Sequence, residues 1–69
     1  MPVTVDRVQS PIGPIVRASV SHAGGVLTAH KYPNKPLRVT FVDQWGEVSY
    51  PMMTGANKRA WAALVQALA

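Results

Sequence analysis

The stretch LRVTFVDQWGEVSY, which runs from Leu37 to Tyr50, decides the fold. Leu37, Val39 and Phe41 alternate with polar residues, and this is the period of a strand with one buried face. The next four residues, Asp-Gln-Trp-Gly at 43–46, have Asp first and Gly last, as a type I turn favours. The sequence therefore predicts a β-hairpin over residues 37–50.

The hydrophobic pattern also predicts the register of this hairpin. Placing Val42 opposite Glu47 sets Phe41 opposite Val48, so that the large apolar side chains share one face. A shift by one residue would place Phe41 against Ser49 and break that face. We therefore expect Val48 on the buried side of the sheet.

A second hairpin is expected just before the first. Residues 15–21 and 26–32 each alternate between apolar and polar side chains. Ala23-Gly24-Gly25 lies between them, and its Gly-Gly pair can supply the positive φ of a tight turn. Its buried face would hold Val16, Ala18, Val20, Leu27 and Ala29. Its other face would hold Arg17, Thr28, His30 and Tyr32.

The C-terminal part of the chain predicts a helix. Residues 56–68 are rich in good helix formers, and Thr54 is a residue type that can cap a helix start. Four apolar residues follow the i, i+3, i+4, i+7 spacing of one helical stripe: Trp61, Leu64, Val65 and Leu68. A helix with a single stripe should pack against the sheet.

The sequence thus predicts an α+β fold: an antiparallel sheet of about four strands, built from two hairpins, followed by one C-terminal helix packed on it. Residues 1–14 would be an N-terminal arm or short edge strand, and residues 15–69 a single small domain. A small barrel closed by the helix is the alternative. In element order alone, residues 15–69 are similar to the single-stranded-DNA-binding fold of the Whirly proteins and related transcriptional coactivators, although no motif matches that family residue by residue.

Composition narrows the function. The 69 residues include seven basic and three acidic side chains, a net charge of +4, which favours anionic partners. There is no cysteine, as is common in a reducing cytoplasm, and we expect neither a signal peptide nor a membrane span. Only 14% of residues are charged, so a protein partner or self-association is also plausible. We expect a homodimer that shares part of the helix stripe.

Catalysis is not expected. His22 and His30 have no neighbouring acid in the sequence, and Asp43 and Glu47 are explained by a turn and a strand face. No P-loop, nucleophile-elbow or zinc-protease motif is present. The sequence therefore predicts a non-enzymatic protein without cofactor or metal.

Cations and one aromatic residue form the candidate binding surface. On or beside the outer sheet face we expect Arg17, Lys31, Tyr32, Lys35 and Arg38, with Tyr32 stacking on a base. Lys58 and Arg59 fall in the first helical turn, where a cation is unfavourable unless an anion binds nearby. These residues predict nucleic-acid binding, with single strands as one candidate ligand. The alternative for both groups is a simple solvated surface.

A second hypothesis makes the chain a protein-interaction module, such as an inhibitor or adaptor that docks on a larger protein. Trp45 at the hairpin tip, with Met52 and Met53, would then be the anchors. Trp45 could equally fold back onto Trp61 or the helix.

Overall fold

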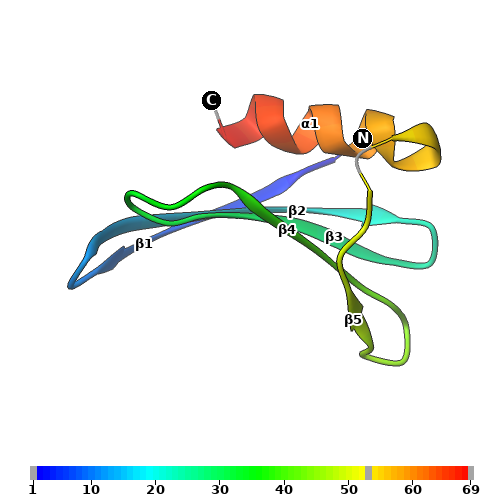
Figure 1. Cartoon of the computed structure of the whole chain (residues 1–69), viewed down its shortest axis with the longest axis horizontal. Helices are drawn as coiled ribbons and strands as arrows, with labels where there is room; N and C mark the ends of the chain where they lie inside the picture. The colour runs from blue at the N-terminus through cyan, green and yellow to red at the C-terminus, as the bar shows by residue number, and fades with distance from the viewer. Residues whose placement is uncertain (1, 53, 69) are drawn as a thin grey trace.

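The chain folds into one five-stranded sheet with a helix on one side, as the computed structural model in Figure 1 shows. The structure describes residues 2–52 and 54–68. Its elements are β1 (Thr4–Ser10), β2 (Gly13–His22), β3 (Gly25–Lys31), β4 (Arg38–Val42), β5 (Val48–Ser49), the short 3₁₀ helix η1 (Gly55–Asn57) and α1 (Lys58–Leu68).

The sheet is a simple antiparallel meander. Its strands lie in the order β1-β2-β3-β4-β5, so β1 and β5 are opposite edges and the sheet is open rather than a barrel. The predicted α+β class, with an antiparallel sheet followed by one packed helix, is confirmed. The sheet has five strands rather than about four because residues near the N-terminus add an edge strand.

That edge strand is β1. It pairs with β2 along its whole length, from Thr4 opposite Ser19 to Ser10 opposite Gly13. Pro11 and Ile12 therefore form the turn of a hairpin, which is closed by a bond from the Ser10 hydroxyl to the carbonyl oxygen of Gly13 at 2.7 Å.

The turn between β2 and β3 is made by Ala23 and Gly24, whose φ angles are 49° and 80°. Two consecutive positive φ angles are what a two-residue hairpin turn with the native twist requires. Gly25 is already in β3, opposite His22. It needs to be glycine for another reason: a Cβ there would run into the carbonyl oxygen of Val42 and the ring of Phe41.

The predicted register of the β4–β5 hairpin is wrong by one residue. Phe41 lies opposite Ser49 and Val42 opposite Val48, so Val48 faces away from the core and is 55% exposed. Asp43 explains the shift. Its carboxylate accepts the N–H groups of Trp45 and Glu47, both at 2.9 Å, and its own N–H donates to the carbonyl of Glu47. The expected turn bond from the Gly46 N–H to the Asp43 carbonyl is present at 3.0 Å.

With Asp43 paired to Glu47, the loop holds three residues, and Gly46 takes the positive φ of 82° that closes such a loop. The local hydrogen bonds of one aspartate thus decide the register. The hydrophobic pattern does not decide it, because β5 is short and its side chains are exposed on both faces.

The core lies between α1 and the middle of the sheet. Its fully buried members are mostly small: Ala18, Val20, Leu27, Ala29, Ala60 and Leu64. Alanines on both the strands and the helix let the two layers approach closely, and Trp61 and Leu68 pack around this centre. Most of the predicted stripe is thus confirmed as the packing face, but Val65 is 43% exposed.

Within the part of the chain that the structure describes, no helix is both long and apolar enough to cross a membrane.

Candidate nucleic-acid interface

The face of the sheet opposite α1 is covered by no described element (Figure 1). This open face carries a row of charged and polar side chains across four strands. Asp6, Arg17, His30 and Arg38 lie directly opposite one another in β1, β2, β3 and β4. Since opposite residues in neighbouring strands point to the same side, these four side chains form one line perpendicular to the strands. The sequence placed Arg17, His30 and Arg38 on one face, and the register brings them side by side.

Tyr32 lies just after β3, two residues beyond His30, and therefore on the same face as this row. Its ring is nearly parallel to that of His30, with an angle of 9° and a centroid distance of 6.4 Å. The backbone N–H of Lys35 donates to the carbonyl of Tyr32 at 3.3 Å, and this turn returns Lys35 to the neighbourhood of Tyr32 and Arg38. The open face therefore presents the two rings that the sequence pattern placed on it, and the structure shows that they are nearly parallel.

His30 is the electrostatic centre of the row. Partial burial, then the positive charges of Arg17 and Arg38, lower the pKa of His30 below its usual value. Its Nε2 lies 3.3 Å from the hydroxyl of Thr40 on β4. A neutral imidazole between two guanidinium groups can gain a proton when an anion binds, because the anion offsets the repulsion.

Beside the charged row lies a row of hydroxyls that sequence reasoning missed. Its members are paired across the same four strands: Thr4, Ser19, Thr28 and Thr40. The hydroxyls of Ser19 and Thr28 lie 3.2 Å apart, and Thr28 is only 9% exposed. The signal was present in the polar alternation of each strand, but recognising a row requires the inter-strand register.

Three of the predicted cations lie elsewhere. Lys31 pairs with Val16 and points to the helix side, where it borders a small apolar hollow with Leu37, Val65 and Leu68. Lys58 and Arg59 begin α1, on the other side of the sheet from Arg17 and Arg38. The seven predicted contact residues thus form one group on the open face, namely Arg17, Tyr32, Lys35 and Arg38, and two separate groups on the helix side.

The helix start lacks the predicted side-chain cap. Thr54 has extended backbone geometry and accepts the N–H of Asn57 with its carbonyl at 3.2 Å, but its hydroxyl makes no capping bond. No acidic residue lies in the first turn of α1. The placement of Lys58 and Arg59 in that turn is as the sequence predicted.

The predicted protein anchors are exposed. Trp45 is 80% exposed at the tip of the β4–β5 hairpin, so it does not fold back onto Trp61. Tyr50 and Met52 are each 75% exposed on the segment that follows. Met53 lies outside the described residues.

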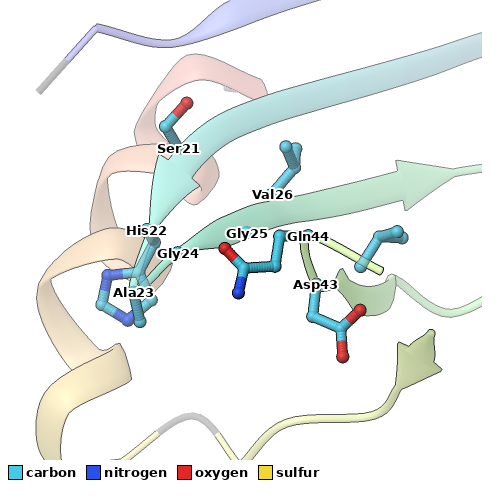
Figure 2. A pocket seen from close by; sticks show the side chains of 9 residues that line it. Ser21, His22, Ala23, Gly24, Gly25, Val26, Asp43 and Gln44 are labelled. Atoms are coloured by element: carbon cyan, nitrogen blue, oxygen red, sulfur yellow. The ribbon is translucent and has the colours of Figure 1, made fainter. Parts of the chain in front are cut away.

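At the other end of the sheet, His22 and Asp43 are not paired with each other. A hollow of about 590 Å³ there is lined by the β2–β3 turn and by residues 42–44, and Figure 2 shows the His22 ring and the Asp43 carboxylate well apart in it. Both are occupied by structural hydrogen bonds: His22 with Asn57, and Asp43 with its own loop. Among the described residues, no group of three or more His, Cys, Asp or Glu side chains could hold a metal ion.

Comparisons with protein-family models, with curated proteins and with solved structures found no match for this chain.

Proposed function

We propose that this chain is a small non-catalytic nucleic-acid-binding protein whose contact surface is the open face of the sheet. One observation carries the proposal: Arg17, Lys35 and Arg38 gather on that face around the parallel rings of Tyr32 and His30. Cations bind phosphates and release counterions, while aromatic rings stack on bases.

The shape of this surface favours single strands. Reading of duplex DNA in the major groove uses a helix or a two-stranded ribbon that enters the groove. The described residues present instead a sheet face with side chains standing on it, and stacking on Tyr32 requires a base that is not paired within a duplex. The net charge of +4 supports association with any polyanion.

Binding should be measured with labelled single-stranded and double-stranded oligonucleotides at about 50 and 200 mM salt, a range over which phosphate contacts weaken strongly. The test variant is Arg17→Gln with Arg38→Gln. Its matched control is Lys58→Gln with Arg59→Gln, which removes the same charge from the helix side. We expect the test variant to bind single strands more weakly and to reduce the log–log salt slope by about 1.4, or 0.7 per phosphate contact.

Two results would contradict the proposal. Equal losses in both variants would show that only the overall charge matters. Absence of binding by the unmodified protein at the lower salt concentration would remove nucleic acid as the ligand.

A second function is supported by the exposure of Trp45, Tyr50 and Met52. Large exposed apolar side chains are enriched at protein-binding hot spots, Trp and Tyr above all. In a protein-interaction module, Trp45→Ala would abolish capture of a protein partner that is retained after nuclease treatment, whereas Arg17→Gln with Arg38→Gln would not. Loss of capture on nuclease treatment would assign that partner to the nucleic-acid function instead.

The homodimer also stays a proposal. The helix stripe expected to form it is largely used within the chain, because Trp61, Leu64 and Leu68 pack on the sheet. A dimer would therefore need another surface, and sedimentation at tens of micromolar, where a micromolar interface is populated, measures whether one forms.

A further inference from the structure

The ring of Tyr32 lies between two hollows on the open face, and their chemistry differs. The first has a volume of about 210 Å³ and is lined by Asp6, Val8, Ile15, Arg17, His30 and Tyr32. The second has a volume of about 340 Å³ and is lined by Ile12, Tyr32, Lys35, Pro36, Leu37 and Arg38. Among the described residues, Tyr32 alone lines both of them.

The first hollow suits one flat ring. Val8 and Ile15 are paired across β1 and β2 and provide an apolar side, while His30 and Tyr32 provide the parallel rings. Sites for drug-sized ligands usually measure about 300–1,000 Å³, so a hollow of about 210 Å³ fits a smaller group. An aromatic and apolar hollow of that size is the environment in which a single nucleobase stacks.

A phosphate would be repelled on one side of Tyr32 and attracted on the other. The Asp6 carboxylate borders the first hollow and lies 3.9 Å from the Arg17 guanidinium, so it repels an anion and already offsets one cation. The second hollow has Lys35 and Arg38, and none of the described residues that line it is acidic. A nucleotide would therefore place its phosphate on the Lys35 side and its base on the Asp6 side.

Asp6 also limits which base fits. An ionised carboxylate can only accept hydrogen bonds, so it pairs with the exocyclic amino groups of cytosine, adenine or guanine. Where cytosine carries its 4-amino group, thymine and uracil carry the O4 carbonyl oxygen, which a carboxylate repels. Their one donor on this edge, N3–H, lies between two carbonyl oxygens.

We propose that one nucleotide of a single strand binds across Tyr32. Its base lies in the hollow beside Asp6 and His30, and its phosphate lies at Lys35 and Arg38. Asp6 favours bases that carry an exocyclic amino group. This inference rests on the proposed nucleic-acid-binding function. It adds to that function which side of Tyr32 binds the base, which side binds the phosphate, and which bases are preferred.

The test compares short cytosine and thymine homo-oligonucleotides of equal length at one salt concentration. The intact protein should bind the cytosine strand more tightly. Asp6→Asn should reduce this ratio, because an amide both donates and accepts and carries no charge. Glu47→Gln is the matched control, since it removes one exposed acid from the β4–β5 loop and should leave the ratio unchanged.

Stacking of the base on Tyr32 is tested separately, by measuring the affinity of Tyr32 variants and of a strand without bases. Tyr32→Phe should bind nearly as well as the unmodified protein, whereas Tyr32→Ser should bind at least about fivefold more weakly, the lower end of measured stacking effects. A cytosine strand with abasic sites should show a similar loss with the unmodified protein, which makes this arm independent of the folding of any variant.

The possible results distinguish the position and selection of the base from nucleic-acid binding as such. Equal affinity for cytosine and thymine strands, or a preference that survives Asp6→Asn, overturns the role of Asp6. If the abasic strand binds as tightly as the intact strand, no base occupies the hollow beside Asp6 and His30, and that part of the proposal is wrong. Salt-dependent binding in the same experiment would still support the proposed nucleic-acid-binding function. No binding of any strand at low salt overturns both.

Discussion

The Nε2 atom of His22, at the end of β2, lies 2.9 Å from the Oδ1 atom of Asn57, the residue just before α1. The amide nitrogen of Asn57 donates to the carbonyl of Met52 at 2.9 Å, so its oxygen is the atom that faces His22. His22 must therefore donate from a protonated Nε2. This pair ties the start of the helix to the sheet across 35 residues of sequence.

Breaking this tie should lower stability in graded steps. His22→Ala removes one hydrogen bond and should cost about 1 kcal/mol of unfolding free energy, while Asn57→Ala removes two and should cost more. In a domain of this size about 1 kcal/mol corresponds to a fall in Tm of roughly 4–8 °C. Thermal unfolding followed by circular dichroism measures both variants. Equal stability of Asn57→Ala and the unmodified protein would contradict this account of the helix start.

Two neighbouring residues of α1 should respond very differently to truncation. Leu64 is fully buried in the core, so Leu64→Ala leaves a cavity and should cost about 2–5 kcal/mol. Val65 is 43% exposed, so Val65→Ala should change stability by no more than about 0.5 kcal/mol. Denaturant unfolding of both variants tests the orientation of the helix on the sheet, and a larger loss for Val65→Ala would show that the helix is rotated.

The two adjacent glycines of the β2–β3 hairpin should also differ. Gly24 has a φ of 80° with no atom near an added Cβ, so Gly24→Ala should cost about 1–2 kcal/mol, through backbone strain alone. At Gly25 an added Cβ would meet the backbone of Val42 and the ring of Phe41, and Gly25→Ala should cost about 3 kcal/mol or more. The same unfolding measurement ranks them, and the reverse order would contradict the close approach of β4 to Gly25.

His30 should give stability and binding opposite pH dependences. Its pKa in the folded chain is lowered by burial, Arg17 and Arg38, so between that value and the ordinary one near 6.5 the unfolded chain holds more protons. The contribution of His30 to stability is therefore complete above about pH 6.5 and declines as pH falls through this window. A phosphate bound at Arg38, the residue paired with His30, offsets the Arg38 charge and so favours the protonated ring. Affinity for nucleic acid should therefore rise as pH falls over the same interval.

His30→Gln is the variant that checks both trends. It should make the stability curve flatter and remove part of the rise in affinity at low pH. If the pH dependence of binding is the same in His30→Gln and in the unmodified protein, His30 does not take part in the interface.

The sequence correctly predicts those strands in which apolar and polar residues alternate over many positions. Alternation over β2, β3 and β4 correctly separates the core face with Ala18 and Leu27 from the open face with Arg17 and His30. The β4–β5 register could not be predicted in this way, because two exposed residue pairs carry little hydrophobic preference and the Asp43 carboxylate fixes the loop.

The candidate site was predictable in its residue types and less so in its arrangement. Arg17, Tyr32 and Arg38 follow from strand alternation. Two features depend on which strands are neighbours: the position of Asp6 beside Arg17, and the row of hydroxyls. His30 and Tyr32 share a face by alternation alone, and only the parallel orientation of their rings goes beyond the sequence pattern. For Lys31, strand alternation alone gives the correct position. Lys31 directly follows His30 in β3, so its side chain lies on the helix side, away from the face where its charge was expected to act.

The central claim, that the open face of the sheet binds single-stranded nucleic acid, is tested most directly by mapping the contact surface with NMR. Isotope-labelled protein should be titrated with a short cytosine strand at low salt while the backbone amide signals are followed. The account predicts shifts centred on Arg17, His30, Tyr32, Lys35 and Arg38, with little change at the buried residues Ala60 and Leu64. Shifts confined to Lys58 and Arg59 or to the segment from Trp45 to Met52, or no shifts at all, would contradict it.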